Sequence, residues 1–132
     1  MKINGKLILA SSSPRRINIL NEIGLAPEVI SPKTEEINDT QSSPGEFAKR
    51  MAFLKAEWVS NEVLEEIDHW ILAADTVVVS SGKLLGKPKD TDDAKRMLAG
   101  LSGKTHKVIT AFCIIGSSLR EPHIETVESF VT

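Results

Sequence analysis

One short run near the start of this sequence has the residue types and spacing needed to bind an anion. An apolar segment, residues 7–10, passes through Ser11, Ser12 and Ser13 into Pro14, and Arg15 and Arg16 follow. Ser13 suits the N-cap of a helix and the proline its first position, where a missing N–H costs nothing. Free backbone N–H groups, a positive dipole end, hydroxyls and two guanidinium groups then meet in one place. This combination predicts a site for an anion, and a chain of phosphates suits it best.

A second candidate is Asp75, a carboxylate inside the strongly apolar run 70–79. A buried charge is costly unless it is paired or binds a metal. The functional interpretation is a general base or a metal ligand at a strand end beside a pocket. The structural alternative is a strand that ends or bends at Asp75, or a carboxylate bonded to a neighbouring backbone amide.

Four further charged residues are weaker candidates when they are considered alone. Glu35 and Glu36 are adjacent acids in a polar loop, and such pairs are commonly only solvated. Lys55 lies off the apolar stripe of its expected helix, and most exposed helix cations are only surface charges. Lys87 stands between a glycine and a proline just after the Asp75 strand, a pattern that also makes ordinary turns.

Several well-known nucleotide and metal sites do not fit the sequence. It contains neither a G-x-x-x-x-G-K-[ST] loop nor a G-x-G-x-x-G loop, which argues against the P-loop and Rossmann classes. Its three histidines are scattered and its single cysteine cannot form a thiolate cluster, so no local zinc motif is present. Ser-His-Asp catalysis stays open, although no G-x-S-x-G elbow occurs.

Length and composition are those of one ordinary globular domain. The chain has 132 residues, of which 41% are hydrophobic and 26% charged. No apolar run approaches the roughly 18 residues of a membrane span, so we expect no membrane association. The start lacks the apolar segment of a secretory signal, and the lone Cys113 fits a reducing compartment. We therefore expect a cytoplasmic protein.

Charge is distributed unevenly along the chain. Residues 1–33 carry a balance of +3, residues 34–75 of −7, residues 76–111 of +4, and the last 21 residues of −2. Such blocks are compatible with a site that pairs cations for phosphate with carboxylates for a metal, and equally with a solvated acidic helix face. The net charge of −2 argues against a general nucleic-acid binder.

The elements that must position these residues alternate between strands and helices, which predicts the α/β class. We expect strands at 7–11, 27–30, 70–79, 107–115 and 121–131. Helices are expected from Ser13 to Gly24, from Ser43 toward 62–68, and over 91–99 with a stop at Gly100. The residues expected to be buried on these helices are Ile17, Leu20, Ile23, Phe47, Met51, Leu54, Trp58, Ala94, Met97 and Leu98.

Taken together, these segments resemble the Maf family of nucleoside triphosphate pyrophosphatases. The matching pieces keep the family's order and similar spacing: LASSSPRR (9–16), EE (35–36), KA (55–56), AADT (73–76), GKP (86–88) and LSGKTH (101–106). The resemblance implies an elongated, mixed and partly antiparallel sheet flanked by helices, as in Maf and inosine-triphosphatase proteins. It implies one domain over residues 1–132 that lacks the family's C-terminal part, including a glutamine expected to contact the base.

The resemblance also implies a reaction and a role for each candidate residue. The reaction is hydrolysis of a nucleoside triphosphate between its α and β phosphates, giving the monophosphate and pyrophosphate. Asp75 would be the proton acceptor, and Glu36, with Glu35, would join it in holding a divalent cation, Mg²⁺ or Mn²⁺. The phosphate path would be lined by Ser11, Ser13, Arg15, Arg16, Lys55 and Lys87.

Thr76 directly after the aspartate resembles the branch of the family that acts on dTTP and UTP. Arg15 and Thr76 would then determine specificity. Two alternatives stay open: a 7-methyl-GTP-type substrate, and a nucleotide-binding protein without catalysis that acts in division and septum formation. The expected partner is the nucleotide, with neither nucleic acid nor membrane, and the resemblance makes a homodimer plausible.

Overall fold

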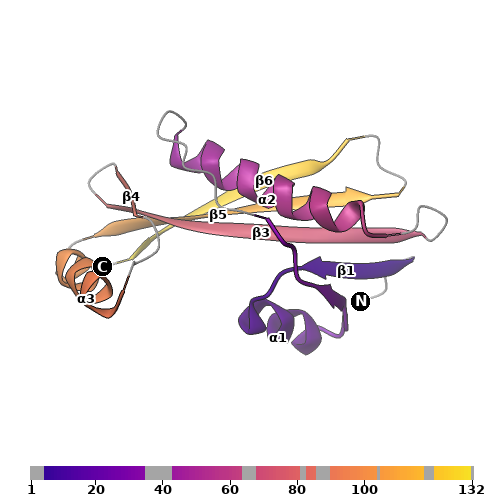
Figure 1. The fold of residues 1–132 in the computed structure, drawn as a ribbon, viewed down its shortest axis with the longest axis horizontal. Helices are drawn as coiled ribbons and strands as arrows, with labels where there is room; N and C mark the ends of the chain where they lie inside the picture. Colours follow the sequence, from indigo (N-terminus) through magenta and orange to yellow (C-terminus); the bar gives the residue numbers. More distant parts are fainter. Residues whose placement is uncertain are drawn as a thin grey trace.

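A mixed six-stranded sheet forms the centre of the part of the chain that the structure describes (Figure 1). The computed structural model describes residues 5–34, 43–63, 68–80, 83–85, 90–103, 105–117 and 121–131. Its strands are β1 (Lys6–Ala10), β2 (Glu28–Ile30), β3 (His69–Ser80), β4 (Lys83–Leu85), β5 (His106–Gly116) and β6 (His123–Val131). Its helices are α1 (Pro14–Glu22), α2 (Pro44–Ser60) and α3 (Thr91–Leu101). The expected class, a mixed sheet flanked by helices, is confirmed.

The long strand β3 organises the sheet, whose order is β2-β1-β3-β5-β6. β5 pairs antiparallel with β3 along almost its whole length. On the opposite edge of β3, β1 runs parallel as far as Ala73, and β4 pairs antiparallel only from Val78 onward. Among the described residues, no strand pairs with positions 74–77 on that edge. The sheet is therefore interrupted beside Asp75 and Thr76.

Helix α2 covers one face of the sheet and builds the core (Figure 1). Ala48, Ala52 and Ala56 are spaced four residues apart and fully buried, so this face of α2 presents small side chains to the sheet. The predicted burial of Phe47 and Met51 is confirmed. The other two predicted stripe residues, Leu54 and Trp58, are only partly buried, because the buried face is centred on the alanines.

Helices α1 and α3 are more exposed than the sequence predicted. α1 lies near β1, on the side of the sheet away from α2 (Figure 1), and has no fully buried residue; Ile17 and Leu20 are partly buried. The predicted burial of Ile23, at the end of α1, was wrong, because this residue is 48% exposed. In α3, Ala94 and Met97 are partly buried, whereas Leu98 is 67% exposed, so its predicted burial was wrong.

Glycines were predicted to end α1 and α3, and the two predictions have different outcomes. Gly24 follows α1 with φ +83, as expected of a C-terminal stop. The predicted stop at Gly100 was wrong, because α3 continues through it to Leu101, and Gly103 is the residue with the left-handed φ of +72. The short strand β4 was not predicted. Within the described residues, no helix is long and apolar enough to cross a bilayer.

Candidate active site

The serine turn between β1 and α1 is held in shape by its own hydroxyl groups. Ser11 is 5% exposed, and its Oγ accepts a hydrogen bond from the backbone N–H of Ser13 at 3.0 Å. Ser13 has extended backbone geometry and caps α1, with its Oγ 3.5 Å from the backbone nitrogen of Arg16. Pro14 takes the first helical position. The predicted cap and helix start are confirmed, and they bring the turn to the interruption of the sheet.

The first turn of α1 has a charge pattern that opposes helix stability. It contains no acidic residue, and Arg15 and Arg16 stand directly after Pro14. Cations at a helix N-terminus are repelled by the dipole, each by about 0.3–1 kcal/mol when they are exposed. The backbone N–H groups of the same turn attract anions. The pattern therefore favours a bound anion, which would be attracted by both the arginines and the dipole.

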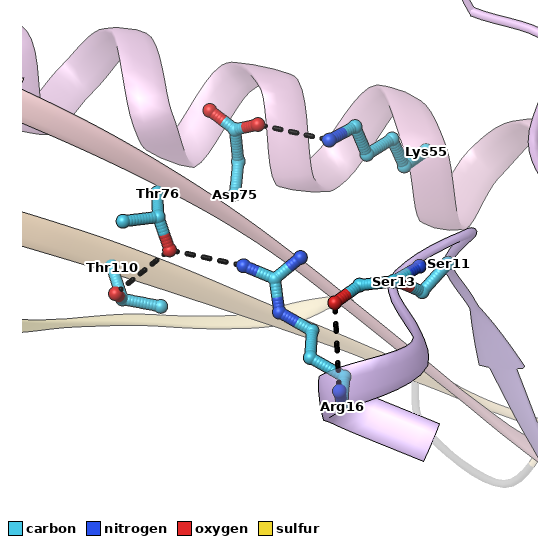
Figure 2. Close-up of polar contacts among 7 residues, drawn as sticks. All are labelled: Ser11, Ser13, Arg16, Lys55, Asp75, Thr76 and Thr110. Carbon is cyan, nitrogen blue, oxygen red and sulfur yellow. Dashed lines mark hydrogen bonds and ion pairs between the residues drawn. The ribbon is translucent and has the colours of Figure 1, made fainter. Parts of the chain in front are cut away.

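Arg16 reaches from α1 to the sheet, as Figure 2 shows. Its Nη2 donates a hydrogen bond to Thr76 Oγ1 at 2.9 Å. Thr76 Oγ1 is in turn 3.0 Å from Thr110 Oγ1, and the two threonines are directly paired across β3 and β5. Thr110 was not among the residues predicted from the sequence. Its polar side chain within the mostly apolar run 107–115 was a signal in the sequence. The sequence does not, however, give the pairing register of β3 and β5 that places Thr110 beside Thr76.

Asp75 points to the other face of β3, toward α2 (Figure 2). Its Oδ1 forms an ion pair with Lys55 Nζ at 2.9 Å, and the two side chains are 13% and 25% exposed. The strand continues to Ser80, so the alternative in which it ends at Asp75 was wrong. Lys55 is likewise no surface cation, because it lies against the site. A mostly buried carboxylate is thus kept next to a positive charge.

Two hollows meet at these residues. The smaller one, about 220 Å³, is lined by Ser11, Ser13, Arg16 and Lys55, together with Ala10, Ser12, Pro32, Thr34, Met51 and Ala74. The larger one, about 540 Å³, is lined by Arg15, Arg16, Thr76 and Thr110 and by the apolar residues Leu9, Ile19, Leu20, Leu72, Val108 and Phe112, besides Ser13 and Ala74. Arg16 and Ser13 border both. The structure therefore brings together six of the predicted substrate-binding residues around the interruption of the sheet beside β3.

Cys113 lies in the core beneath α2 and takes no part in this arrangement. It is fully buried, and burial raises the pKa of its thiol from an ordinary 9.0 to about 11. The thiolate is the nucleophilic form, so this side chain is inert at neutral pH.

The family to which the chain belongs follows from its match to a protein-family model. The model described as "Maf-like protein" matches residues 6–132. The chain is a member of the Maf family. A relative from Desulfotalea psychrophila, named dTTP/UTP pyrophosphatase, is 42% identical over 130 residues, covering 98% of this chain and 65% of the relative. One of the same name from Alkaliphilus oremlandii is 46% identical over 110 residues, covering 83% of this chain and 56% of the relative.

Solved structures show the same fold at low sequence identity. The Staphylococcus aureus Ham1 protein superimposes on this Maf chain with a TM-score of 0.60 at 16% identity, over 95% of this chain and 70% of that one. A nucleoside-triphosphatase, dITP/XTP pyrophosphatase, from Mycobacterium abscessus gives a TM-score of 0.52 at 16% identity, over 95% and 71% of the two chains. The expected likeness to the inosine-triphosphatase fold is confirmed. The Maf chain spans roughly half to two thirds of the length of the curated relatives that it matches.

Of the three predicted metal ligands, Asp75 is the one that lies within the described residues. Glu35 and Glu36 lie outside the described residues, as does Lys87 of the predicted phosphate path. Across the part of the chain that the structure describes, no three acidic, histidine or cysteine side chains are grouped closely enough to hold a metal ion. Asp75 itself fits Mg²⁺ or Mn²⁺, because carboxylate oxygens are suitable ligands and Mg²⁺ often binds through one or two of them plus substrate phosphates. The glutamates stay a prediction.

Proposed function

We propose that this Maf chain hydrolyses dTTP or UTP to the nucleoside monophosphate and pyrophosphate. One observation carries the proposal: hydroxyls and cations line one cavity at the interruption of the sheet beside β3, and the Lys55–Asp75 ion pair places a carboxylate at the same point. The names of the curated relatives, dTTP/UTP pyrophosphatases, support the reaction and the substrates.

The smaller hollow is proposed to hold the phosphates. A triphosphate carries three to four negative charges, and here Arg16 and Lys55 face the cavity together with the serine hydroxyls. Guanidinium and ammonium groups form charge-assisted hydrogen bonds with phosphate oxygens, which are roughly twice as strong as neutral ones. Backbone N–H groups at the start of α1 add donors and a favourable dipole. Lys87 would extend this path.

Asp75 is proposed to accept the proton of the attacking water. The oxygen of that water forms a bond with the α-phosphorus, the bond from this phosphorus to the bridging oxygen breaks, and pyrophosphate leaves. Lys55 orients the carboxylate and balances its charge at 2.9 Å. Asp75, with Glu35 and Glu36, would hold the divalent cation, which lowers the pKa of water and stabilises charge on the phosphoryl oxygens.

The larger hollow suits the nucleoside. Its walls are mostly apolar, while Arg15 and Thr76 add polar groups. Ligand pockets commonly combine apolar walls with a few polar groups that fix orientation. We therefore place the base here and propose Arg15 and Thr76 as residues that determine specificity. A homodimer and a cytoplasmic location also stay predictions.

Pyrophosphate release from dTTP, UTP and 7-methyl-GTP, with Mg²⁺ or Mn²⁺, tests the proposal. We expect release from dTTP and UTP and much slower release from 7-methyl-GTP. Faster cleavage of 7-methyl-GTP would overturn the substrate assignment. Calorimetry in parallel separates binding from catalysis: affinity for dTTP without turnover, at high protein concentration, would favour the binding protein and contradict the enzyme.

A further inference from the structure

Three polar side chains from three different elements form one continuous chain of hydrogen bonds. Arg16 of α1 donates to Thr76 of β3, and Thr76 is bonded to Thr110 of β5. The distance from Arg16 Nη2 to Thr76 Oγ1 is 2.9 Å, and the distance between the two threonine Oγ1 atoms is 3.0 Å. Figure 2 shows the three side chains in this order, on the face of the sheet away from Asp75. The link connects the first turn of α1 through β3 to β5, a strand that the proposed function otherwise uses only as a wall of the larger hollow.

Thr110 has apolar neighbours on its own strand. Val108 and Phe112 flank it on the same face and line the same hollow. Among the described residues, the Thr110 hydroxyl makes one hydrogen bond, and its partner is the Thr76 hydroxyl. Thr76 Oγ1 already accepts from Arg16 with one lone pair, and it retains a second lone pair and its own proton for Thr110. Both threonines can therefore be satisfied at once.

The link matters because Arg16 lies where the two hollows meet. Its guanidinium borders both the small hollow with the serines and Lys55 and the large hollow with Thr76 and Thr110. An arginine side chain has several rotatable bonds, and an exposed hydrogen bond to one threonine restrains it only if that threonine is itself fixed. Thr110 supplies the fixed point, because it lies on a central strand paired on both edges by β3 and β6.

We infer that Thr110 is a positioning residue: through Thr76, its hydroxyl holds the Arg16 guanidinium between the two hollows, ready to bind the phosphates of a nucleoside triphosphate. This inference rests on the proposed function for its ligand, but the hydrogen-bonded chain itself is a property of the free protein. The two can therefore be tested separately.

Thr110→Val is the informative variant, because it removes the hydroxyl and keeps the β-branched shape that suits a strand. We expect the Kd and the KM for dTTP to rise about 3- to 10-fold, as for the loss of one hydrogen bond, with kcat changed less than about twofold. Thr110→Ser retains the hydroxyl and should restore both constants to within about twofold of the wild type. Thr126→Val makes the same chemical change on β6, facing the α2 side of the sheet, and should leave both constants unchanged.

A second readout needs no nucleotide. Nuclear magnetic resonance of the Arg16 guanidinium protons should show faster exchange with water in Thr110→Val than in the wild type, with Thr110→Ser close to the wild type. Unchanged exchange in Thr110→Val would overturn the inference, and so would unchanged dTTP affinity in a chain that binds dTTP. If the wild-type chain neither binds nor cleaves dTTP, the proposed function fails, and the exchange rates alone decide the role of Thr110.

Discussion

At the scale of single residues, Asp75 shows how an anomaly in a sequence leads to a site. A carboxylate inside an apolar strand requires a partner, and the structure supplies Lys55 from α2 at 2.9 Å. The anomaly was readable in the sequence, whereas its partner was not, because the two residues are twenty positions apart on different elements. The family resemblance was the only reason to place Lys55 in the predicted site, and Thr110 was identified only from the structure.

Replacing Asp75 with asparagine tests its proposed role as the proton acceptor. Pyrophosphate release from dTTP should fall about 10²–10⁴-fold, the range that general base catalysis contributes. The melting temperature should fall only modestly, because asparagine keeps the shape of the side chain and its Oδ1 can still accept a hydrogen bond from Lys55, although the ion pair is lost. The matched control is Asp68→Asn, since Asp68 is an exposed aspartate just before the same strand. This variant should release pyrophosphate as fast as the wild type. Activity retained in Asp75→Asn would remove Asp75 from the mechanism.

At the scale of elements, the site depends on how α1 begins. The Ser13 cap, the proline after it and two arginines in the first turn bring donors and positive charge to the interruption of the sheet beside β3. A cap of the same kind starts α2, where Ser43 accepts from the backbone N–H of Glu46 at 3.3 Å. The second cap has an acidic residue in its first turn, as the helix dipole prefers, and lines neither of the two hollows. The two caps therefore allow stability and binding to be separated.

Ser13→Ala and Ser43→Ala should each lower the free energy of unfolding by about 1 kcal/mol, through the loss of an N-cap. Only Ser13→Ala should also weaken dTTP binding, by roughly 3- to 10-fold, because its hydroxyl lines the proposed phosphate cavity. Urea denaturation and calorimetry measure the two effects. Equal dTTP affinity in both variants would mean that Ser13 is only a cap.

Local signals in the sequence predicted most of these elements. The two serine–proline caps and the Gly24 stop are confirmed because each depends on backbone preferences of a few adjacent residues. The stop predicted at Gly100 was wrong, because a glycine inside a helix lowers its stability by only about 1 kcal/mol and need not end it. β4 has three residues and is too short to give an alternating pattern.

At the scale of the whole molecule, the site is joined to the core through α2. The alanines that face the sheet and Lys55 that faces Asp75 belong to the same helix, so the fit of α2 on the sheet fixes the ion pair. The sequence predicted that α2 would bury an apolar stripe, but the interruption between β1 and β4 requires the pairing register of distant strands. No local pattern contains that information. The sequence therefore predicted the candidate residues better than their arrangement.

Ala52→Leu tests the link between the core and the site. Ala52 is fully buried against the sheet, and a larger side chain there should lower the free energy of unfolding by about 1–3 kcal/mol. Moving α2 outward would also separate Lys55 from Asp75, so pyrophosphate release should fall even well below the melting temperature. Ala99→Leu, on the exposed side of α3, is the matched control and should change neither quantity. A destabilised variant with full activity would show that the ion pair tolerates displacement of the helix.

The most direct test of the central claim is to trace where the oxygen of water goes when dTTP is hydrolysed in H₂¹⁸O. Attack on the α-phosphorus predicts that mass spectrometry finds one ¹⁸O in each dTMP and none in the pyrophosphate. Asp75→Asn should slow the appearance of labelled dTMP without moving the label. Label in the pyrophosphate, release of orthophosphate with dTDP, or no cleavage of dTTP at all would contradict the account.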